Sequence, residues 1–419
     1  MNKSVFASLL IAAANASLKI GVVSDPHFNT AYSAYSSASN CVSKQFSGEI
    51  LAPIGRYGCD PSEDMIDYMF TKFSDSFGAV DVILVPGDSV AHKIAASAVG
   101  DDPDYAHYEA VKANLAATFA KFKEYFPTTM ILPTFGNNDG RYHDEAIDES
   151  LKQDYYSFVY DLWFNQLPGN ANLPNRSEIN STLLAAGYYR ADITPQVTLL
   201  SINSMYVDAE ATETHDGEAD IISNWFPYQL QLARAEGRKV LIMDHVYAGA
   251  SGKNEVMWIE DANTQYFKNL RDYHDVVIME VVGHEHYGDL RYHSSNNVAG
   301  LPDPAVKFDF HNILVSPGVT PYDGSNPGVT YFELDANLIP LGLRMEFLDL
   351  NTTLGKSSVL YEDLTWNTVD FANDWGLTQL DATSLATFRK RLEDNGEDYT
   401  NNYLVAKLGF NYNIPAEFT

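Results

Sequence analysis

The chain has 419 residues, of which 45% are hydrophobic and 13% aromatic, so it can bury a large core and is not a disordered chain. It carries 27 basic and 56 acidic residues, a formal net charge of -29. Because such a surface repels polyanions, the charge argues against nucleic acid and acidic lipid as partners.

The first residues, MNKSVFASLLIAAANAS, have the features of a secretory signal peptide. The apolar run from Val5 to Ala14 is too short to span a bilayer, and Ala14-Asn15-Ala16 has the small-x-small pattern of a cleavage site. We therefore expect a signal peptide over residues 1–16 and a protein that is secreted or resident in a lysosome or vacuole. No later stretch reaches membrane-spanning length and the last residues carry no anchor signal, so we expect no stable membrane anchor.

Two further features fit a secretory compartment. Asn175, Asn180 and Asn351 each begin a glycosylation sequon, so N-glycans are expected there. Cys41 and Cys59 are the only cysteines. In an oxidising compartment the pair predicts a disulfide; the alternative is two free buried thiols.

Five apolar runs of strand length each end in a residue that can bind a metal ion. In chain order they are LKIGVVSDPH (18–27), VDVILVPGDS (80–89), TTMILPTFGNND (128–139), KVLIMDH (239–245) and DVVIMEVVGHEH (275–286). Runs rich in Val and Ile are typical of strands buried on both faces. Two helices are expected between them, one over 60–77 with Asp60 as N-cap and Pro61 at the first helical position, and one over 108–126.

Alternating strands and helices predict an α/β architecture in which at least part of the sheet is parallel. Ligands of such sheets bind beyond the carboxyl ends of the strands. The metal-binding residue types at the ends of the five runs are Asp25, His27, Asp88, Asn137, His245, His284 and His286. Each alone has an ordinary alternative, because a lone His is often structural and Gly-Asn-Asn-Asp is typical of a turn. Their coincidence at strand ends favours one shared site.

The chemistry of these seven residues predicts two divalent metal ions. Imidazoles, carboxylates and one amide, without a thiolate, suit zinc, manganese or iron better than a sulfur-rich structural zinc. Asp88, on a short Gly-Asp turn, is the natural carboxylate to bridge two ions. Two such ions clamp a phosphate and activate a bridging water as hydroxide, and their charge lets a strongly acidic protein accept an anionic substrate.

The same residues carry a family resemblance. The order D-x-H at Asp25, G-D at Asp88, G-N-x-D at Asn137, a later His245 and G-H-x-H at His284 resembles the calcineurin-like metallophosphoesterases. A narrower resemblance, to acid sphingomyelinase-like phosphodiesterases, covers nearly the whole chain after residue 16. It rests on the segments CVSKQFSGEILAPIGRYGCDPS, GDSVAH, GYYRADITPQVTLLSINSMY, SPGVTPYDGSNPGVTYFELD and LATFRKRLEDNGEDYTNNYLVAKLGF.

This resemblance implies a two-sheet α/β sandwich flanked by helices, with a metallophosphoesterase domain over 17–350 and a small helical subdomain over 351–419. It implies two ions, usually zinc in this branch. One would be held by Asp25, His27, Asp88 and His286, and the other by Asp88, Asn137, His245 and His284. His92 matches a family histidine that faces the phosphate. We expect no saposin-like lipid-presenting domain before the first strand, because the expected signal peptide runs almost directly into that strand.

Two departures from the family pattern concern the substrate. Asn138 stands where most of the family has a histidine that protonates the leaving group, and an amide cannot act as a general acid. Endopolyphosphatase-like members also carry Asn there. His92 or His143 would then supply the proton, or the leaving group would need none, as a phosphate would not. The loop after His245, MDHVYAG, differs from the G-H-x-P-P-G of many relatives.

Two functions follow from these residues. The first is a phosphoesterase that hydrolyses phosphodiester or phosphoanhydride bonds in nucleotides, polyphosphate or choline phosphodiesters, with intact membrane sphingomyelin ranked lower. The second is a non-catalytic, glycosylated metal- and phosphate-binding protein. The complete ligand set favours the enzyme. Aromatic residues near the motifs stack on a base or merely pack; they are Tyr142, Tyr247, Tyr287 and Tyr322.

Overall fold

The computed structural model describes residues 17–34, 51–94, 103–211, 220–251, 255–294, 309–407 and 409. The expected signal peptide over 1–16 lies outside the described residues, and so does Cys41. Cys59 is described and buried. The signal peptide and the disulfide therefore stay predictions.

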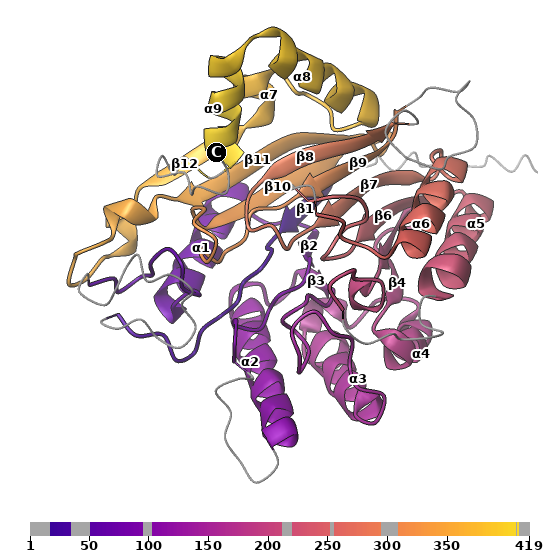
Figure 1. Ribbon diagram of the computed structural model, residues 1–419, viewed down its shortest axis with the longest axis horizontal. Helices are drawn as coiled ribbons and strands as arrows, with labels where there is room; N and C mark the ends of the chain where they lie inside the picture. Colours follow the sequence, from indigo (N-terminus) through magenta and orange to yellow (C-terminus); the bar gives the residue numbers. More distant parts are fainter. Residues whose placement is uncertain are drawn as a thin grey trace, which may run out of the picture.

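Two mixed sheets of six strands form the centre of the molecule (Figure 1). The first has the order β12 (Trp366–Asp370), β11 (Pro340–Leu348), β10 (Gly328–Leu334), β1 (Leu18–Val22), β2 (Val82–Val85) and β3 (Met130–Pro133). The second has the order β4 (Tyr189–Asp192), β5 (Val197–Ser201), β6 (Lys239–Met243), β7 (Val277–Val282), β9 (Asp309–Val315) and β8 (Asp289–Ser294). The predicted α/β sandwich flanked by helices is confirmed.

Helices flank both sheets. They are α1 (Glu63–Phe77), α2 (Pro103–Tyr125), α3 (Lys152–Tyr160), α4 (Arg176–Ala186), α5 (Phe226–Glu236), α6 (Glu260–Asp272), α7 (Phe371–Trp375), α8 (Ala382–Asp394) and α9 (Glu397–Lys407). Helix α1 packs on β10 and β11, α5 on β5 and β6, and α8 on β8 and β9. Figure 1 shows α4, α5 and α6 along one flank and α7, α8 and α9 grouped together.

The five apolar runs form strands whose carboxyl ends point the same way within each sheet. β1, β2 and β3 are parallel neighbours, and β6 runs parallel to β5 and β7. Side chains on these strands are buried on both faces, as their continuous apolar sequence predicts. On β6, for example, Leu241 joins the core between the sheets, while Ile242 joins the cluster under α5 and α6.

The N-terminus of α1 corrects one prediction. The helix begins at Glu63, and its N-cap is Ser62, whose hydroxyl accepts from the backbone N–H of Met65 at 3.1 Å. Asp60 is not the cap because its buried carboxylate accepts from the backbone and the ring of His92 instead. Both residue types cap helices, so a tertiary partner decides between them.

The other predicted helix, over 108–126, corresponds to α2. It starts earlier than expected, with Pro103 at its first position, where the missing N–H of proline has no cost. The polypeptide after residue 350 contributes a strand as well as helices, because β12 pairs antiparallel with β11. The domain boundaries at 16 and 350 stay predictions.

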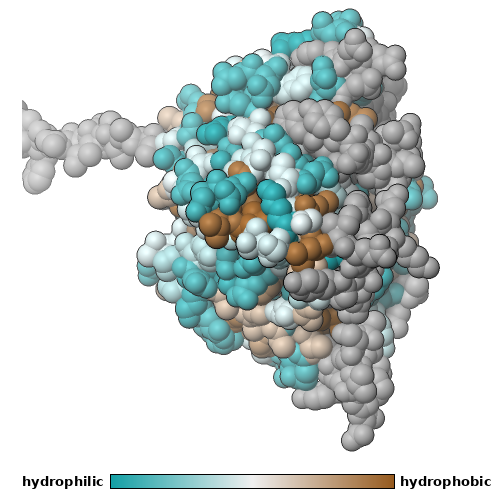
Figure 2. All heavy atoms as spheres, turned by 90° about the vertical axis from the view of Figure 1, so that its left-hand side faces the viewer, coloured by the Kyte–Doolittle hydropathy of each residue, from teal (hydrophilic) through white to brown (hydrophobic). Residues whose placement is uncertain are grey.

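The described surface is mixed in character. On the face drawn in Figure 2, hydrophilic and intermediate residues surround small, separate hydrophobic patches. Among the helices of the described residues, none combines the length and the apolar character that crossing a membrane requires.

Candidate metal centre

The loops that follow β1, β2, β3, β6 and β7 carry all seven predicted ligands. Asp25 and His27 follow β1, Asp88 follows β2, Asn137 follows β3, His245 follows β6, and His284 and His286 follow β7. The structure brings these loops together, because His245 Nδ1 contacts the carbonyl of Pro86 and the backbone N–H of His284 donates to Asp25 Oδ1. At the closest approach, a Cβ on Gly136 would lie 2.1 Å from Asp88 Oδ1, so only glycine fits beside the Asp88 turn.

Backbone strain is concentrated in these loops. Five of the seven predicted ligands have positive φ angles: Asp25 at 47°, His27 at 36°, Asp88 at 52°, His284 at 72° and His286 at 57°. For residues other than glycine this conformation costs about 1–3 kcal/mol each, and it persists only where the surroundings enforce it. Such clustered strain is typical of a functional site.

One donor set comprises Asp25, His27, Asp88 and His286, which are all buried and offer ligand atoms within 4.8 Å of one another. His27 Nε2 lies 3.1 Å from Asp88 Oδ2, and His286 Nε2 lies 3.5 Å from Asp25 Oδ1. Among the described residues, none forms a hydrogen bond with the buried His27 Nε2, as expected of an atom that binds a metal ion. This set is the one that the resemblance assigns to the first ion.

The second set centres on the Asn137 amide oxygen. This Oδ1 lies 2.8 Å from His245 Nε2 and 3.3 Å from His284 Nδ1. His245 Nε2 is also 3.3 Å from Asp88 Oδ2, the same oxygen that faces His27. Asp88 therefore lies between the two sets, where a bridging carboxylate belongs.

Three of the histidine rings have an oxygen atom beside the ring nitrogen Nδ1. Nδ1 of His27 contacts the carbonyl of Val90, and Nδ1 of His245 contacts the carbonyl of Pro86, each at 2.7 Å. Nδ1 of His286 lies 2.9 Å from the Asp323 carboxylate, an ion-pair contact without hydrogen-bond geometry. An acceptor at one nitrogen fixes the proton there and presents the other nitrogen as a ligand, which is the usual arrangement around metal-binding histidines.

The carboxylates of the site are ionised. Burial alone would raise the pKa of Asp88, but His245 and His27 hold it well below its usual range. Burial opposes the ionisation of Asp25 in the same way, and hydrogen bonding and charge from His286 lower its pKa below the usual value. Both groups are thus in the form that binds cations.

The histidines divide into two kinds. Burial lowers the pKa of His27, and burial together with His245 lowers that of His284 to about 4, so both rings are neutral. For His245 the charges of Asp88 and Asp25 outweigh burial and raise the pKa to about 9, and Asp323 and Asp25 raise that of His286. These two protons offset the buried carboxylates. Divalent ions fit this site because they would take the place of these two protons beside the carboxylates.

His92 lies against the first donor set. Its ring stacks on His27 at 3.9 Å between centroids and on Tyr322 at 3.7 Å. Its Nδ1 lies 2.7 Å from an Asp60 oxygen that also accepts from the Thr320 hydroxyl. Burial lowers the pKa of His92 to about 3 and raises that of Asp60 to about 7. The ring is therefore neutral. His27 and Tyr322 pack on its two faces, and Asp60 contacts its Nδ1 edge.

Asn138 contacts the Asp88 carboxylate. Its backbone N–H donates to Asp88 Oδ1 and its side-chain amide donates to Asp88 Oδ2, each at 2.8 Å. The amide thus positions Asp88 in this structure.

His143, the other predicted substitute acid, lies at the rim of the site. Its Nε2 is 3.0 Å from the Asn137 amide nitrogen and its Nδ1 is 2.5 Å from Asp144, which together with Asn137 forms a small polar cluster. The side chain is 57% exposed, so it can meet a substrate at the entrance. Its catalytic role stays a prediction.

The sequence alone assigned no role at the metal centre to three acidic residues that the structure places there. Asp139 joins two ligand loops, because its carboxylate accepts from the backbone N–H groups of Ser89 at 2.8 Å, Val90 at 2.9 Å and Gly136 at 2.8 Å. Asp60 orients His92, and Asp323 orients His286. The only sequence signal was proximity to a motif: Asp139 closes GNND, and Asp60 follows Cys59.

The four tyrosines near the motifs have different surroundings. Tyr247 and Tyr287 are buried, and the Tyr247 hydroxyl donates to Glu285 while the Tyr287 hydroxyl accepts from Arg291. Tyr322 covers His92. Tyr142 is 42% exposed beside His143, with the Arg141 guanidinium 4.0 Å from its ring centre, so it presents the most accessible aromatic ring of the four.

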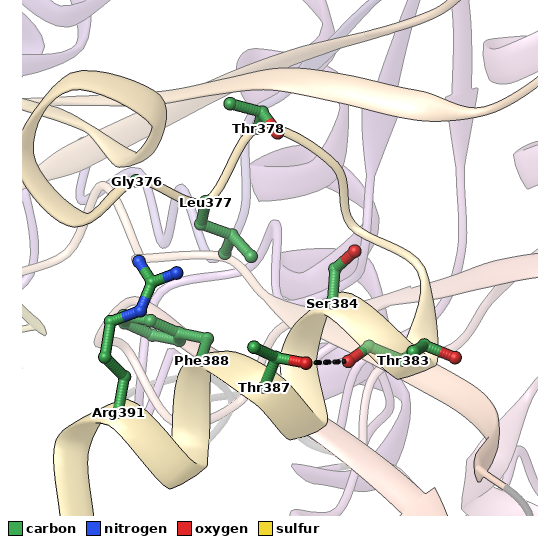
Figure 3. Close-up of a pocket in the computed structure, with 8 residues that line it drawn as sticks. All are labelled: Gly376, Leu377, Thr378, Thr383, Ser384, Thr387, Phe388 and Arg391. Atoms are coloured by element: carbon green, nitrogen blue, oxygen red, sulfur yellow. Dashed lines mark hydrogen bonds between the residues drawn. The ribbon is translucent and has the colours of Figure 1, made fainter. Parts of the chain in front are cut away.

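A separate surface pocket lies in the C-terminal helical part (Figure 3). It has a volume of about 150 Å³ and is lined by hydroxyl groups, Phe388 and Arg391 between the α7–α8 loop and α8. None of the predicted ligands lines it.

An α/β sandwich with a buried cluster of histidines and carboxylates at its strand ends, which holds no thiolate among the described residues, is suited to bind divalent metal ions. The comparison with protein families agrees. The calcineurin-like phosphoesterase family matches residues 18–288, which include all seven predicted ligands, and the chain belongs to this family. The predicted resemblance is confirmed.

Curated relatives place the chain in the predicted branch. It is 23% identical to sphingomyelin phosphodiesterase A of Dictyostelium discoideum over 88% of this chain and 59% of the relative. It is 25% identical to an endopolyphosphatase of Schizosaccharomyces pombe over 74% of this chain and 50% of the relative. The chain thus spans about half the length of these curated relatives. A dimetal phosphatase from Danio rerio aligns with 78% of this chain and 95% of its own at a TM-score of 0.44 and 12% identity.

Proposed function

We propose that the protein is a binuclear metal-dependent phosphoesterase that hydrolyses phosphodiester or phosphoanhydride bonds. The observation that carries the proposal is the position of Asp88. One oxygen of this carboxylate faces His27 of the first donor set and His245 of the second, at 3.1 and 3.3 Å. A single ionised oxygen between two sets of histidines, which are either neutral or can lose a proton to a metal ion, is an arrangement that holds two cations side by side.

The chemistry divides between the ions and the protein. Two divalent ions, which we expect to be zinc, would offset the charge of the phosphate and lower the pKa of a water molecule. Asp88 holds the centre of the site, and Asn138 fixes the orientation of its carboxylate. His92, which contacts Asp60 and Tyr322, would bind a phosphate held beside His27.

The residues around the leaving group favour phosphoanhydrides such as nucleotides and polyphosphate. The Asn138 amide already donates a hydrogen bond to Asp88, and an amide cannot act as a proton donor to the leaving group. The His92 ring is neutral with a pKa of about 3, so it is a poor proton donor at pH 5 to 7. A leaving phosphate needs less protonation than an alcohol, and therefore suits this site better than a choline phosphodiester.

Secretion, or residence in a lysosome or vacuole, belongs to the same proposal. Among the three sequons, Asn351 is exposed and accessible to a glycan. Asn175 is half-buried and its amide donates to the carbonyl of Arg190 at 2.7 Å, so Asn351 is the better acceptor. A disulfide between Cys41 and Cys59 would hold the chain next to Asp60.

Substrate release assays test the proposal. The purified protein would be given ATP, long-chain polyphosphate, a choline phosphodiester and micellar sphingomyelin, near pH 5 and pH 7, with and without chelator. We expect turnover of ATP and polyphosphate that a chelator removes and that added zinc or manganese restores. Turnover that survives full metal removal would contradict the mechanism. If the protein binds metal ions but turns over none of these substrates, the non-catalytic phosphate-binding alternative would be favoured.

Replacing His92 by Ala tests how the leaving group departs. If His92 only positions the phosphate, rates on phosphoesters with good and poor leaving groups fall by the same factor, and this is the expected result because its ring is neutral. If His92 is the general acid, the poor leaving group suffers about 10²-fold more. The control is His274→Ala, which changes an exposed histidine on the α6–β7 turn.

A further inference from the structure

The β7–β8 connection, residues 283–288, carries two predicted ligands and one buried acid between them. Glu285 lies between His284 and His286, and its side chain is only 8% exposed. Its carboxylate accepts from the hydroxyl of Tyr247, which follows His245, and pairs with Arg291 of β8 at 3.4 Å. The loops after β6 and β7 are thus joined through a residue that is not itself a predicted ligand.

Helix α9 holds the other end of this connection. The Lys407 ammonium lies 2.7 Å from Asp289, the first residue of β8, and the Tyr403 hydroxyl donates to the same carboxylate at 3.1 Å. The backbone N–H of Gly288 donates to the carbonyl of Lys407 at 3.0 Å. Lys407 also lies over the Tyr287 ring at 4.8 Å. These contacts therefore converge on the residues that directly follow His286.

The contacts form one continuous network from α9 to the ligand loop. Asp289 pairs with Arg291 at 3.5 Å, and Arg291 in turn contacts Glu285 and the Tyr287 hydroxyl. Burial would raise the pKa of Asp289, but Lys407 and Arg291 lower it below its usual value. Asp289 is therefore ionised, and its contacts with Lys407 and Arg291 are charge-assisted.

We propose that the C-terminal helix α9, through Tyr403 and Lys407, is a positioning element of the metal centre that holds the His284–His286 loop in its ligand-binding conformation. The inference rests on the proposed function. Both histidines have positive φ angles, and this conformation needs external support. Figure 1 shows α9 reaching from the C-terminal helices to the sheets beside β11 and β8.

The test is metal affinity, measured on the full chain without reference to turnover. Lys407→Met keeps the length of the side chain and removes its charge. Metal-stripped protein would be titrated with zinc, and separately with manganese, in competition with a chromophoric chelator. We expect about tenfold weaker binding, the effect typical of groups that orient metal ligands. The matched control is Lys390→Met in α8, which breaks an exposed Lys–Asp pair and should bind as the wild type does.

Two further variants separate positioning from general stability. Lys407→Arg should restore affinity to within about threefold, and Tyr403→Phe should weaken binding in the same direction as Lys407→Met. If α9 positions the metal ligands, zinc should raise the unfolding temperature of the variants less than that of the wild type. If its contacts are merely structural, the variants should unfold at temperatures lowered by the same amount with and without metal. Wild-type affinity in Lys407→Met would overturn the inference alone. Failure of the wild-type protein to bind two metal ions would overturn the proposed function.

Discussion

Asp88→Asn is expected to lower kcat by about 10³-fold or more, while the protein remains folded. Two metal ions stabilise the charge of the transition state by several kcal/mol, and each 1.4 kcal/mol corresponds to a tenfold change in rate. The amide of this variant would lack the charge that faces both His27 and His245, so at least one ion would be lost.

The fold should survive because asparagine suits this backbone position. The φ angle of 52° at Asp88 is one that Asn tolerates better than most residues. The amide oxygen of the variant can still accept from the backbone N–H of Asn138. We expect the free energy of unfolding of the metal-free protein to change by about 1–2 kcal/mol, which is one altered buried hydrogen bond.

Steady-state kinetics with ATP and chemical denaturation measure the two effects. Metal content of the purified variant, determined by elemental analysis, should fall from two ions towards one or none. The control is Asp154→Ala, which removes one exposed partner of Lys112 and should leave both quantities nearly unchanged. Undiminished turnover by Asp88→Asn would rule out a bridging role for this carboxylate.

The strand ends could be predicted because their signals are local. Each of the five apolar runs is contiguous, and the residue that follows it is placed at the sheet edge by the direction of the strand alone. The two donor sets needed more than local pattern. They came from the resemblance, and the structure brings the same residues together.

The supporting residues could not be predicted because their partners are distant in sequence. Asp60 and His92 are 32 residues apart, and Asp289 and Lys407 are 118 apart. No periodicity records such pairings. The same reason explains the misplaced cap of α1: Asp60 and Ser62 are both good caps by residue type, and only the contact with His92 decides which one caps the helix.

Asp139→Asn is expected to weaken metal binding more than tenfold and to lower the free energy of unfolding by about 2–4 kcal/mol. The Asp139 carboxylate accepts from three buried N–H groups, two in the Asp88 loop and one at Gly136 in the Asn137 loop. An amide has one acceptor oxygen, and its NH₂ group would face at least one of these donors. One or more buried N–H groups then lose their partner.

The consequence reaches the ligands through the backbone. Ser89 follows Asp88 and Gly136 precedes Asn137, so a displaced N–H group shifts the ligand beside it. Asp139→Ala removes all three acceptor contacts and should have the larger effect on both quantities. If lost hydrogen bonds cause the effect, both quantities should fall most in Asp139→Ala and less in Asp139→Asn. If lost charge alone causes it, the two variants should be affected equally.

Zinc titration and denaturant unfolding would be carried out at pH 8. Burial raises the pKa of Asp139 to about 7, so at this pH the native side chain is an ionised acceptor. The control is Asp161→Asn, an exposed residue whose carboxylate contacts only its helical neighbours Asn165 and Gln166 among the described hydrogen bonds. If Asp139→Asn bound zinc and unfolded as the wild type does, the two ligand loops would be held together by the packing around Gly136 and not by this carboxylate.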